Sequence, residues 1–306
     1  MPLRSFFLLV TALFLWAMGP IFVKLFTAYY DAWTQNAFRY ACAAVLLLVF
    51  ARVRGHLGYR LTRAQWGKLA LVALANLIMQ VIYVQIYYFI YPSVASLIGR
   101  LNIVFVTVLS FLIFKDEREV IRSPRFLFGS ALALAGVVFV IAVQDPQLLS
   151  RLNVAEHDFW IGIVLSLGYA FFISVYFLAI KYAVRDIPAL VSFTHVGWMT
   201  ASGLTGLALA FGNVSDLWRP LSPMLGVMAV SALLCIAIAH SCYYAALRDI
   251  KAVVSVSMLQ AMPVLVCLFS ALVYGDRLSL LQILGGAVVI FGAWLAAMAQ
   301  ARVPEP

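Results

Sequence analysis

The sequence predicts an all-α membrane protein in which ten transmembrane helices form two inverted five-helix repeats. Three observations carry this prediction: the composition, a series of apolar stretches, and the distribution of positive charges between them. Of the 306 residues, 65% are hydrophobic and 11% are charged, whereas about a quarter of an ordinary soluble domain is charged. Stretches of roughly 20 apolar residues, the length that spans a bilayer, occupy almost the whole chain.

Each apolar stretch is expected to be a helix. Backbone polar groups in lipid must be paired internally, which leaves helices and closed barrels, and continuous apolar runs of this length indicate helices. The expected spans are residues 5–25, 32–51, 66–89, 92–114, 124–143, 159–181, 188–211, 222–246, 251–273 and 279–299.

The positive charges set the expected orientation. Of the 21 Lys and Arg residues, 15 fall in alternate connections, 4 fall in the other connections, and 2 (Arg39 and Arg100) lie inside spans. Cytoplasmic connections carry an excess of Lys and Arg, so both termini are expected to be cytoplasmic. Topology and anionic lipid headgroups then explain the net charge of +9, and no nucleic acid partner is expected.

The two halves of the chain resemble each other. Residues 115–118 (Lys-Asp-Glu-Arg) end the fourth span and residues 275–277 (Gly-Asp-Arg) end the ninth, so that Glu117 aligns with Asp276. A span with a Gly-x6-Gly pattern follows each, beginning at Gly129 and Gly285, and such small residues allow close helix packing. Five spans is an odd number, so the second repeat enters the membrane from the opposite side, as in many transporters with a midplane site. We therefore divide the chain into a first repeat at 1–143, an outer connection at 144–158 and a second repeat at 159–300.

Two cations inside spans are not explained by topology. A central arginine costs roughly 2.5–3.5 kcal/mol on insertion scales, so it should face protein or water. For Arg100, two interpretations stay open: it is tied to helix-end carbonyls or a polar neighbour, or it is a cavity cation that meets an anionic group of a substrate. Arg39, nearer a span end, is interpreted as an anchor between helices.

Polar side chains in the third and eighth spans suggest a cavity. Asn76, Gln80, Tyr83 and Tyr87 recur at helical spacing and share one face, which should line a cavity or contact a partner helix. His240 lies near the middle of the eighth span. A buried, hydrogen-bonded histidine is the ordinary interpretation. Because all 12 acidic residues fall in loops or at span ends, His240 is also the leading proton carrier if transport is coupled to protons.

Pro20 and Pro263 interrupt the first and ninth spans. A proline removes a backbone donor and can expose carbonyl groups at membrane depth. Gating hinges and ordinary tolerated kinks are both consistent with this pattern.

Catalytic and cofactor-binding motifs are absent from the sequence. It has no Walker motif, no His-Glu-x-x-His, no pair of intramembrane acids and no nucleophile motif, which argues against an ATP-driven pump and against an enzyme. The four cysteines fall within spans without metal-type spacing. We therefore expect no catalytic residue, no metal site and no cofactor.

The order of these features resembles the drug/metabolite transporter superfamily in its ten-span EamA-type form. The residues that carry the resemblance are Leu15-Trp16-Ala17 through Lys24, Phe38-Arg39-Tyr40, Lys115-Asp116-Glu117-Arg118 and Gly275-Asp276-Arg277, the last two each followed by a Gly-x6-Gly span. The resemblance implies a multi-pass carrier of the bacterial inner membrane, often an exporter, with a central cavity lined mainly by spans 1, 3, 4, 6, 8 and 9.

Together these observations predict a secondary transporter that exports a small organic metabolite, of the amino acid or organic acid type, by alternating access. Protons are a candidate coupling ion, and the lipid bilayer is the other partner. A multidrug or amphipathic compound exporter is the alternative, and an intramembrane lipid-modifying enzyme is a rival of another class. The gating residues would be Pro20 and Pro263. The expected substrate-binding residues are Trp16, Asn76, Gln80, Tyr83, Tyr87, Arg100, Asn102, His240 and Gln260.

Overall fold

The computed structural model describes residues 2–89, 95, 98–144, 157–218, 223–274 and 280–300, and the regular structure in these ranges is helical. A π-helix, Ala232–Ile238, joins two of the α-helices. The α-helices are α1 (Leu3–Ala17), α2 (Gly19–Phe26), α3 (Ala32–Val53), α4 (Arg63–Phe89), α6 (Asn102–Ile113), α7 (Arg118–Arg122), α8 (Pro124–Gln144), α10 (His157–Ala183), α11 (Ala189–Phe211), α12 (Pro223–Ser231), α13 (Ala239–Ala246), α14 (Ala252–Leu259), α15 (Met262–Tyr274) and α16 (Leu280–Gln300).

Helices lie at every predicted span position, and the prediction of an all-helical membrane protein is confirmed. Five helical segments within the described ranges are long and apolar enough to cross a membrane by length and composition, and shorter apolar helices accompany them. The first and ninth spans are each broken into two helices, at Met18 and at residues 260–261. The fourth span differs from the prediction of one continuous helix, because residues 100–101 form a turn and α6 begins only at Asn102.

The packing of the helices follows the repeat. α8 packs along α16, α3 along α11, and α6 against α14, so that corresponding spans of the two halves contact each other. Two further pairs of contacts match: α4 with α10 corresponds to α13 with α1, and α11 with α4 corresponds to α3 with the π-helix. These contacts are the ones that a pseudo-two-fold relation between the halves requires.

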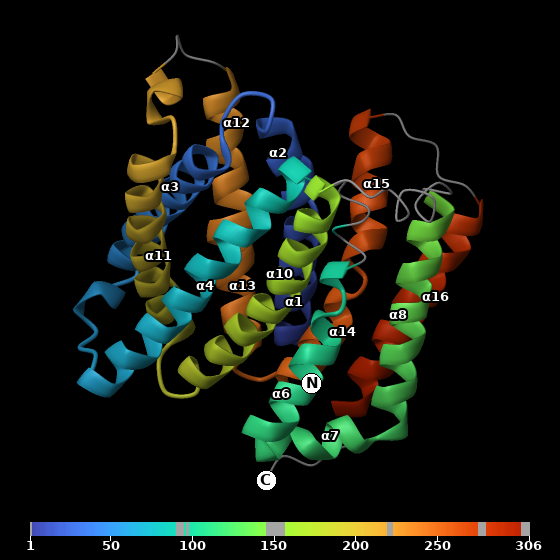
Figure 1. Ribbon diagram of the computed structural model, residues 1–306. Helices are drawn as coiled ribbons and strands as arrows, with labels where there is room; N and C mark the ends of the chain where they lie inside the picture. The colour runs from blue at the N-terminus through green and yellow to red at the C-terminus, as the bar shows by residue number, and fades with distance from the viewer. Residues whose placement is uncertain are drawn as a thin grey trace.

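The two halves run in opposite directions. In Figure 1, α1 rises from the lower end of the bundle, whereas α10, the first helix of the second half, descends towards it. Chain direction alternates from span to span, so that α1 begins and α16 ends at the same lower end (Figure 1). This is the inverted arrangement that an odd number of spans per repeat predicts.

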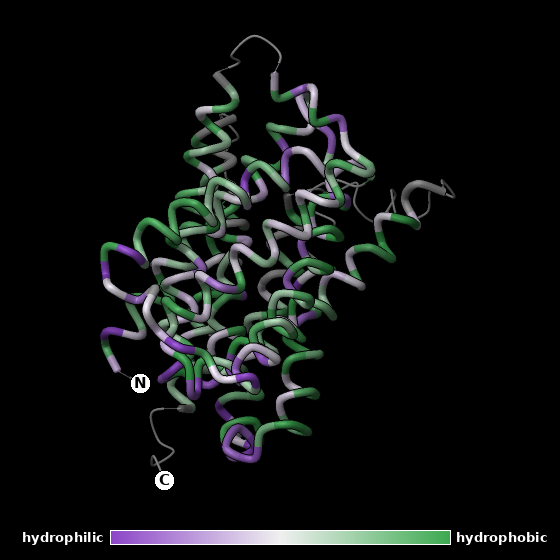
Figure 2. The backbone as a smooth tube through the Cα atoms, turned by 90° about the vertical axis from the view of Figure 1, so that its left-hand side faces the viewer, coloured by the Kyte–Doolittle hydropathy of each residue, from purple (hydrophilic) through white to green (hydrophobic). Residues whose placement is uncertain are grey.

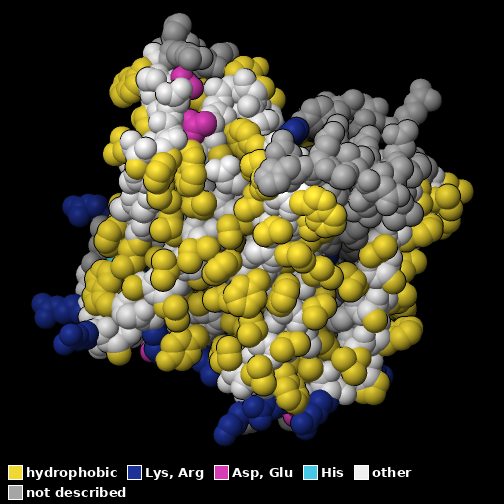
Figure 3. Space-filling model, in the orientation of Figure 1, with side chains coloured by type: hydrophobic (Ala, Val, Ile, Leu, Met, Phe, Trp, Pro, Cys, Tyr) yellow, Lys and Arg dark blue, Asp and Glu magenta, His cyan; other side chains and the backbone are white. Residues whose placement is uncertain are grey.

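The surface has an apolar band and a basic end. Hydrophobic side chains cover the middle of the face seen in Figure 3, and Lys and Arg side chains gather along its lower edge. Figure 2 shows hydrophilic connections at the same end, with mostly hydrophobic helices between the ends. Side chains such as Leu112, Leu209 and Phe211 are 65 to 71% exposed, as expected of a surface that faces lipid.

The Gly-x6-Gly spans cross with their backbones in contact. A Cβ atom added at Gly129 would lie 2.6 Å from the nitrogen of Ala296 and 2.7 Å from the carbonyl oxygen of Gly292. A Cβ atom added at Gly292 would lie 2.5 Å from the nitrogen of Ala133. The glycines thus allow α8 and α16 to touch, and no described side chain of either helix lines the cavity discussed next.

Candidate functional site

A cavity lies in the middle of the bundle, between the two halves. The empty volume of the cavity, including the open solvent at its mouth, is about 1100 Å³. Its walls come from spans 1, 3, 4, 6, 8 and 9, the set that the resemblance implies, together with Arg39 from span 2. The predicted residues that line it are Trp16, Pro20, Gln80, Tyr83, Tyr87, Arg100, Asn102 and His240.

Arg100 lies at the turn that breaks the fourth span and reaches across to the break in the ninth. Its Nη1 donates to the carbonyl oxygen of Leu259 at 3.0 Å, and its Nη2 lies 3.9 Å from Sδ of Met262. Leu259 is four residues before Pro263, and a proline has no N–H to give to that carbonyl. Arg100 therefore binds a carbonyl that Pro263 leaves unpaired. Its Nε is buried and has no partner within the described ranges, so Arg100 is both tied to a helix end and part of the cavity wall.

Arg39 also lies in this wall, which the sequence analysis did not predict. Its side chain is buried, and its Nε donates to Oγ of Ser231 at 3.0 Å, linking α3 to the end of α12. That bond fits the anchoring role expected of Arg39. The Ser231 hydroxyl in turn donates to the carbonyl oxygen of Met228 at 2.8 Å. The anchor therefore holds the guanidinium group at the cavity.

Three tyrosines form an aromatic part of the cavity wall. The ring of Tyr83 lies 5.2 Å from that of Tyr87 and 5.3 Å from that of Tyr169, measured between centroids. Tyr83, Arg39 and Arg100 all line the same cavity. A substrate in this space would thus meet two cations and several hydroxyl-bearing rings.

His240 joins the eighth span to the first. Its Nδ1 lies 3.1 Å from Nε1 of Trp16 and 3.1 Å from the carbonyl oxygen of Ile236, in the π-helix. A ring protonated only at Nε2 accepts the Trp16 hydrogen bond, whereas a ring with a hydrogen on Nδ1 donates to Ile236 instead. The imidazole also stacks on Phe193, with centroids 5.2 Å apart. Protonation at Nδ1 would therefore release Trp16, close to the break at Pro20.

Two predicted substrate residues and one predicted gating residue do not line the cavity. Asn76 accepts from the hydroxyl of Tyr40 at 3.3 Å and donates to Oγ1 of Thr200 at 3.1 Å, so it ties α4 to α3 and α11. Gln260, at the break of the ninth span, is fully buried, and neither atom of its amide has a partner among the described residues. Pro263, one of the two predicted gating residues, lies four residues after Leu259, whose carbonyl oxygen accepts from Arg100, and it is not among the residues that line the cavity.

The sixth span lines the cavity as the resemblance implies, but with residues that the sequence analysis did not name. Tyr169, Ile173, Tyr176 and Phe177 face the cavity. Their spacing of four, three and one residues places them on one helix face. An aromatic and aliphatic stripe of this kind is also what an ordinary buried helix contact looks like, so the pattern alone could not assign it to the cavity.

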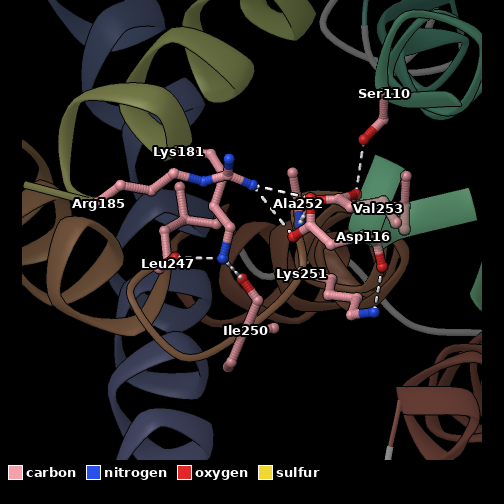
Figure 4. A network of polar contacts seen from close by, with 10 residues as sticks. Ser110, Asp116, Lys181, Arg185, Leu247, Ile250, Lys251, Ala252 and Val253 are labelled. Carbon is pink, nitrogen blue, oxygen red and sulfur yellow. Dashed lines mark hydrogen bonds and ion pairs between the residues drawn. The ribbon is translucent and has the colours of Figure 1, made fainter. Parts of the chain in front are cut away.

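At the lower end of the bundle, a network of polar contacts connects three loops (Figure 4). Glu117 is fully buried, and its carboxylate accepts from the backbone nitrogens of Ala252 and Val253 at 2.7 and 3.1 Å and from Oγ of Ser110 at 2.6 Å. It thereby caps the N-terminus of α14, where backbone N–H groups and the helix dipole favour a negative charge. Lys251 donates to the carbonyl oxygen of Asp116.

Two basic residues, Lys181 at the end of the sixth span and Arg185 in the turn after it, complete the network. Nη2 of Arg185 contacts both carboxylate oxygens of Asp116, at 2.8 and 3.1 Å. Partial burial alone would raise the pKa of Asp116, but the hydrogen bond and charge of Arg185 outweigh it, so the pKa lies below its ordinary value of 3.8. Lys181 donates to the carbonyl oxygens of Leu247 and Ile250, both at 2.8 Å, in the turn between α13 and α14.

Aromatic rings separate this network from the cavity. Tyr176, Phe177, Phe193, Tyr243 and Tyr244 are each at most 2% exposed. Tyr243 lies against Trp16 and Phe177 of the cavity wall, with centroids 4.9 and 4.8 Å away, and its hydroxyl is 3.0 Å from Oγ of Ser255 in α14. The cavity walls continue the other way, to Ile86 and Tyr87 in the last turn of α4. The bundle is thus closed between the cavity and the basic end.

The described side chains offer no metal centre. No group of three or more His, Cys, Asp or Glu side chains among them is close enough to hold a metal ion.

Comparison with known proteins identifies the family. The profile of the EamA-like transporter family matches residues 3–142 and 160–298, and thus both halves. The chain belongs to the EamA-like transporter family. It is therefore a multi-pass membrane transporter and not an enzyme, and the resemblance to the drug/metabolite transporter superfamily is confirmed.

Individual relatives agree with this assignment. An uncharacterized transporter of Haemophilus influenzae is 26% identical over 212 residues, which cover 66% of this chain and 64% of the relative. The match thus spans less than two thirds of that curated protein's length. A solved crystal structure of another protein superposes over the full length of both chains, with a TM-score of 0.81 and 16% identity, and this likeness concerns the fold.

Proposed function

We propose that this EamA-like transporter exports a small organic metabolite, of the amino acid or organic acid type, across the bacterial inner membrane by alternating access. The observation that supports the substrate class is the charge of the cavity. Arg39 and Arg100 line it, and no Asp or Glu is among its described lining residues. A buried charge without a partner is costly, so a substrate that brings a carboxylate fits this site best.

The closed lower end supports the alternating-access mechanism. The aromatic rings and the Glu117 network separate the cavity from the basic end of the bundle, while the walls extend towards the opposite end. Because Lys and Arg mark the cytoplasmic side, both termini would be cytoplasmic and this conformation would face outward. The breaks at Pro20 and Pro263 lie where the walls would have to bend, which supports their role as gating hinges.

The test is transport in proteoliposomes with a panel of amino acids and organic acids. We expect wild-type protein to move an anionic member of the panel, and Arg100→Ala and Gln80→Ala to lose most of that transport. Arg63→Ala, which removes an exposed arginine at the start of α4, is the matched control and should transport normally. Unchanged transport by both cavity variants would refute the site, and everted vesicles would test the direction.

Proton coupling is proposed through His240. Nδ1 of His240 lies between Trp16 and the carbonyl oxygen of Ile236. A proton that binds to Nδ1 would break the hydrogen bond to Trp16 and so affect the first span. An imposed pH gradient should drive uptake by the wild type, whereas His240→Gln should retain downhill exchange and lose the response to the gradient. An equal response by this variant would exclude His240 as the proton carrier.

A multidrug exporter is the second candidate, because aromatic rings make up much of the cavity wall. Broad recognition would depend on those rings rather than on the arginines. Resistance to amphipathic cations that survives Arg100→Ala and disappears in Tyr83→Ala would favour this candidate over the metabolite transporter.

A further inference from the structure

Arg39 has the features of a second substrate-binding cation. Its Nε bond to Ser231 is the one hydrogen bond that the described residues provide to its guanidinium group, although arginine has five N–H donors. The side chain is only 4% exposed, yet it contributes to the cavity wall. The remaining donors of Arg39 are therefore available to a group inside the cavity.

The two cations of the cavity come from different elements and have different anchors. Arg39 is held by Ser231 at the end of α12, whereas Arg100 is held by Leu259 at the end of α14. Neither forms an ion pair within the part of the chain that the structure describes. One monoanion can neutralise only one of them, and the second would remain a buried cation without a partner, at considerable cost.

On this basis we infer that the preferred substrate is a dianion with an acidic group at each end, one bound by Arg39 and the other by Arg100. This inference rests on the proposed function, because it assumes that the cavity carries the transported molecule. The carbon chain of a small dicarboxylate would lie along Tyr83, which lines the same cavity as both guanidinium groups. Charge-assisted bonds to both ends then distinguish a dianion from a monoanion of equal size.

The test compares matched pairs of substrates in proteoliposomes at zero membrane potential. Succinate, glutarate and adipate are each paired with their half-amides, which keep the length and lose one charge. For the best-fitting pair we expect wild-type kcat/KM to favour the dianion at least about tenfold, as one charge-assisted hydrogen bond allows. Arg39→Gln should reduce this ratio to about one while still transporting the half-amide, and Arg39→Lys should keep part of the preference.

The outcomes separate this inference from the proposed function. A wild-type protein that transports dianion and half-amide equally overturns the dianion inference and leaves an organic acid transporter. An unchanged ratio in Arg39→Gln overturns the role of Arg39. A wild-type protein that transports no member of any pair also overturns the dianion inference, and the proposed function is overturned only if the panel of amino acids and organic acids is not transported either. If Arg39→Gln does not fold, the wild-type ratio and the Arg39→Lys ratio still decide the question.

Discussion

Replacing Glu117 by glutamine should loosen the closed end of the transporter. The carboxylate accepts three hydrogen bonds, two of them from the backbone N–H groups of Ala252 and Val253 at the start of α14. In Glu117→Gln one oxygen becomes an NH₂ group, so at least one of these donors faces another donor. A hydrogen bond to a charged acceptor contributes about 1.5–3 kcal/mol, and a charge at a helix N-terminus about 0.3–1 kcal/mol. The lower cost of burying a neutral amide offsets part of this, so we expect a net loss of about 2 kcal/mol.

Hydrogen exchange at α14 measures this loss directly. About 2 kcal/mol corresponds to a roughly 30-fold change in an equilibrium constant, so the amides of Ala252 and Val253 should exchange about 30-fold faster in Glu117→Gln, if exchange requires the carboxylate to leave. Amides in the middle of α11, away from the network, should not change. Glu119→Gln is the matched control, because Glu119 is exposed and close in sequence, and it should exchange like the wild type.

Two results would refute this reasoning. Equal exchange at α14 in Glu117→Gln and wild type would show that the cap does not hold this end closed. Faster exchange throughout the protein would show that Glu117 supports the whole fold and is not specific to the closed end.

Three further predictions concern stability, each measured by thermal unfolding in detergent. Gly129→Ala should cost about 1–3 kcal/mol and lower the Tm by several degrees, because the new methyl group meets backbone atoms of α16. The control Gly206→Ala places its methyl group in open space and should be neutral or stabilising. Equal Tm values for the two variants would contradict the close crossing of α8 and α16. Gln260→Leu should raise stability by about 1–3 kcal/mol, since both amide atoms are buried without described partners; a destabilised variant would show that the amide has a structural role. Arg185→Gln should cost at most about 1 kcal/mol at pH 7, because the side chains of Arg185 and Asp116 are 46% and 45% exposed. Because the pKa of Asp116 is lowered, the ion pair stabilises the fold at pH values above the ordinary carboxyl pKa of 3.8, and this stability is lost as the pH falls through the lowered pKa. The difference in stability between Arg185→Gln and wild type should therefore vanish in acid. A difference that grows on acidification would contradict the ion pair.

Charge and periodicity in the sequence were sufficient to predict the architecture. The alternation of Lys and Arg gives the number of spans, and the odd number of spans per half gives the inverted repeat, which Figure 1 shows in the opposite directions of α1 and α10. The breaks of the first and ninth spans follow from Pro20 and Pro263. No proline marks the turn at Arg100 in the sequence. The turn lies opposite the break at residues 260–261 in the packed structure, so only the tertiary contact identifies it.

The site was predictable only where a polar residue marked it. Gln80, Tyr83 and Arg100 are costly in lipid, so their position in a cavity could be inferred before the structure was known. Ile173 and Phe177 carry no such cost, and their place in the wall depends on how α10 packs. Asn76 shows that a polar residue in a span can also be misassigned to the cavity. Its polarity fits a cavity wall equally well, yet its amide forms hydrogen bonds with Tyr40 and Thr200 between helices.

The contact between Arg100 and Leu259 has a particular place in the repeat. The alignment that pairs Glu117 with Asp276 also pairs Arg100 with Leu259, so the hydrogen bond at 3.0 Å joins two corresponding positions of the two halves. Such a contact lies at the pseudo-two-fold axis. When the halves exchange conformations, contacts at either end must break and form, but a contact at the axis maps onto itself. Arg100 can therefore keep its hydrogen bond to the carbonyl oxygen of Leu259 while the two ends of the bundle open in turn, and the cavity keeps its positive charge. The packing of the two halves is symmetric, whereas the charge of the site is not, because only the first half supplies an arginine at this position and the second half has Leu259.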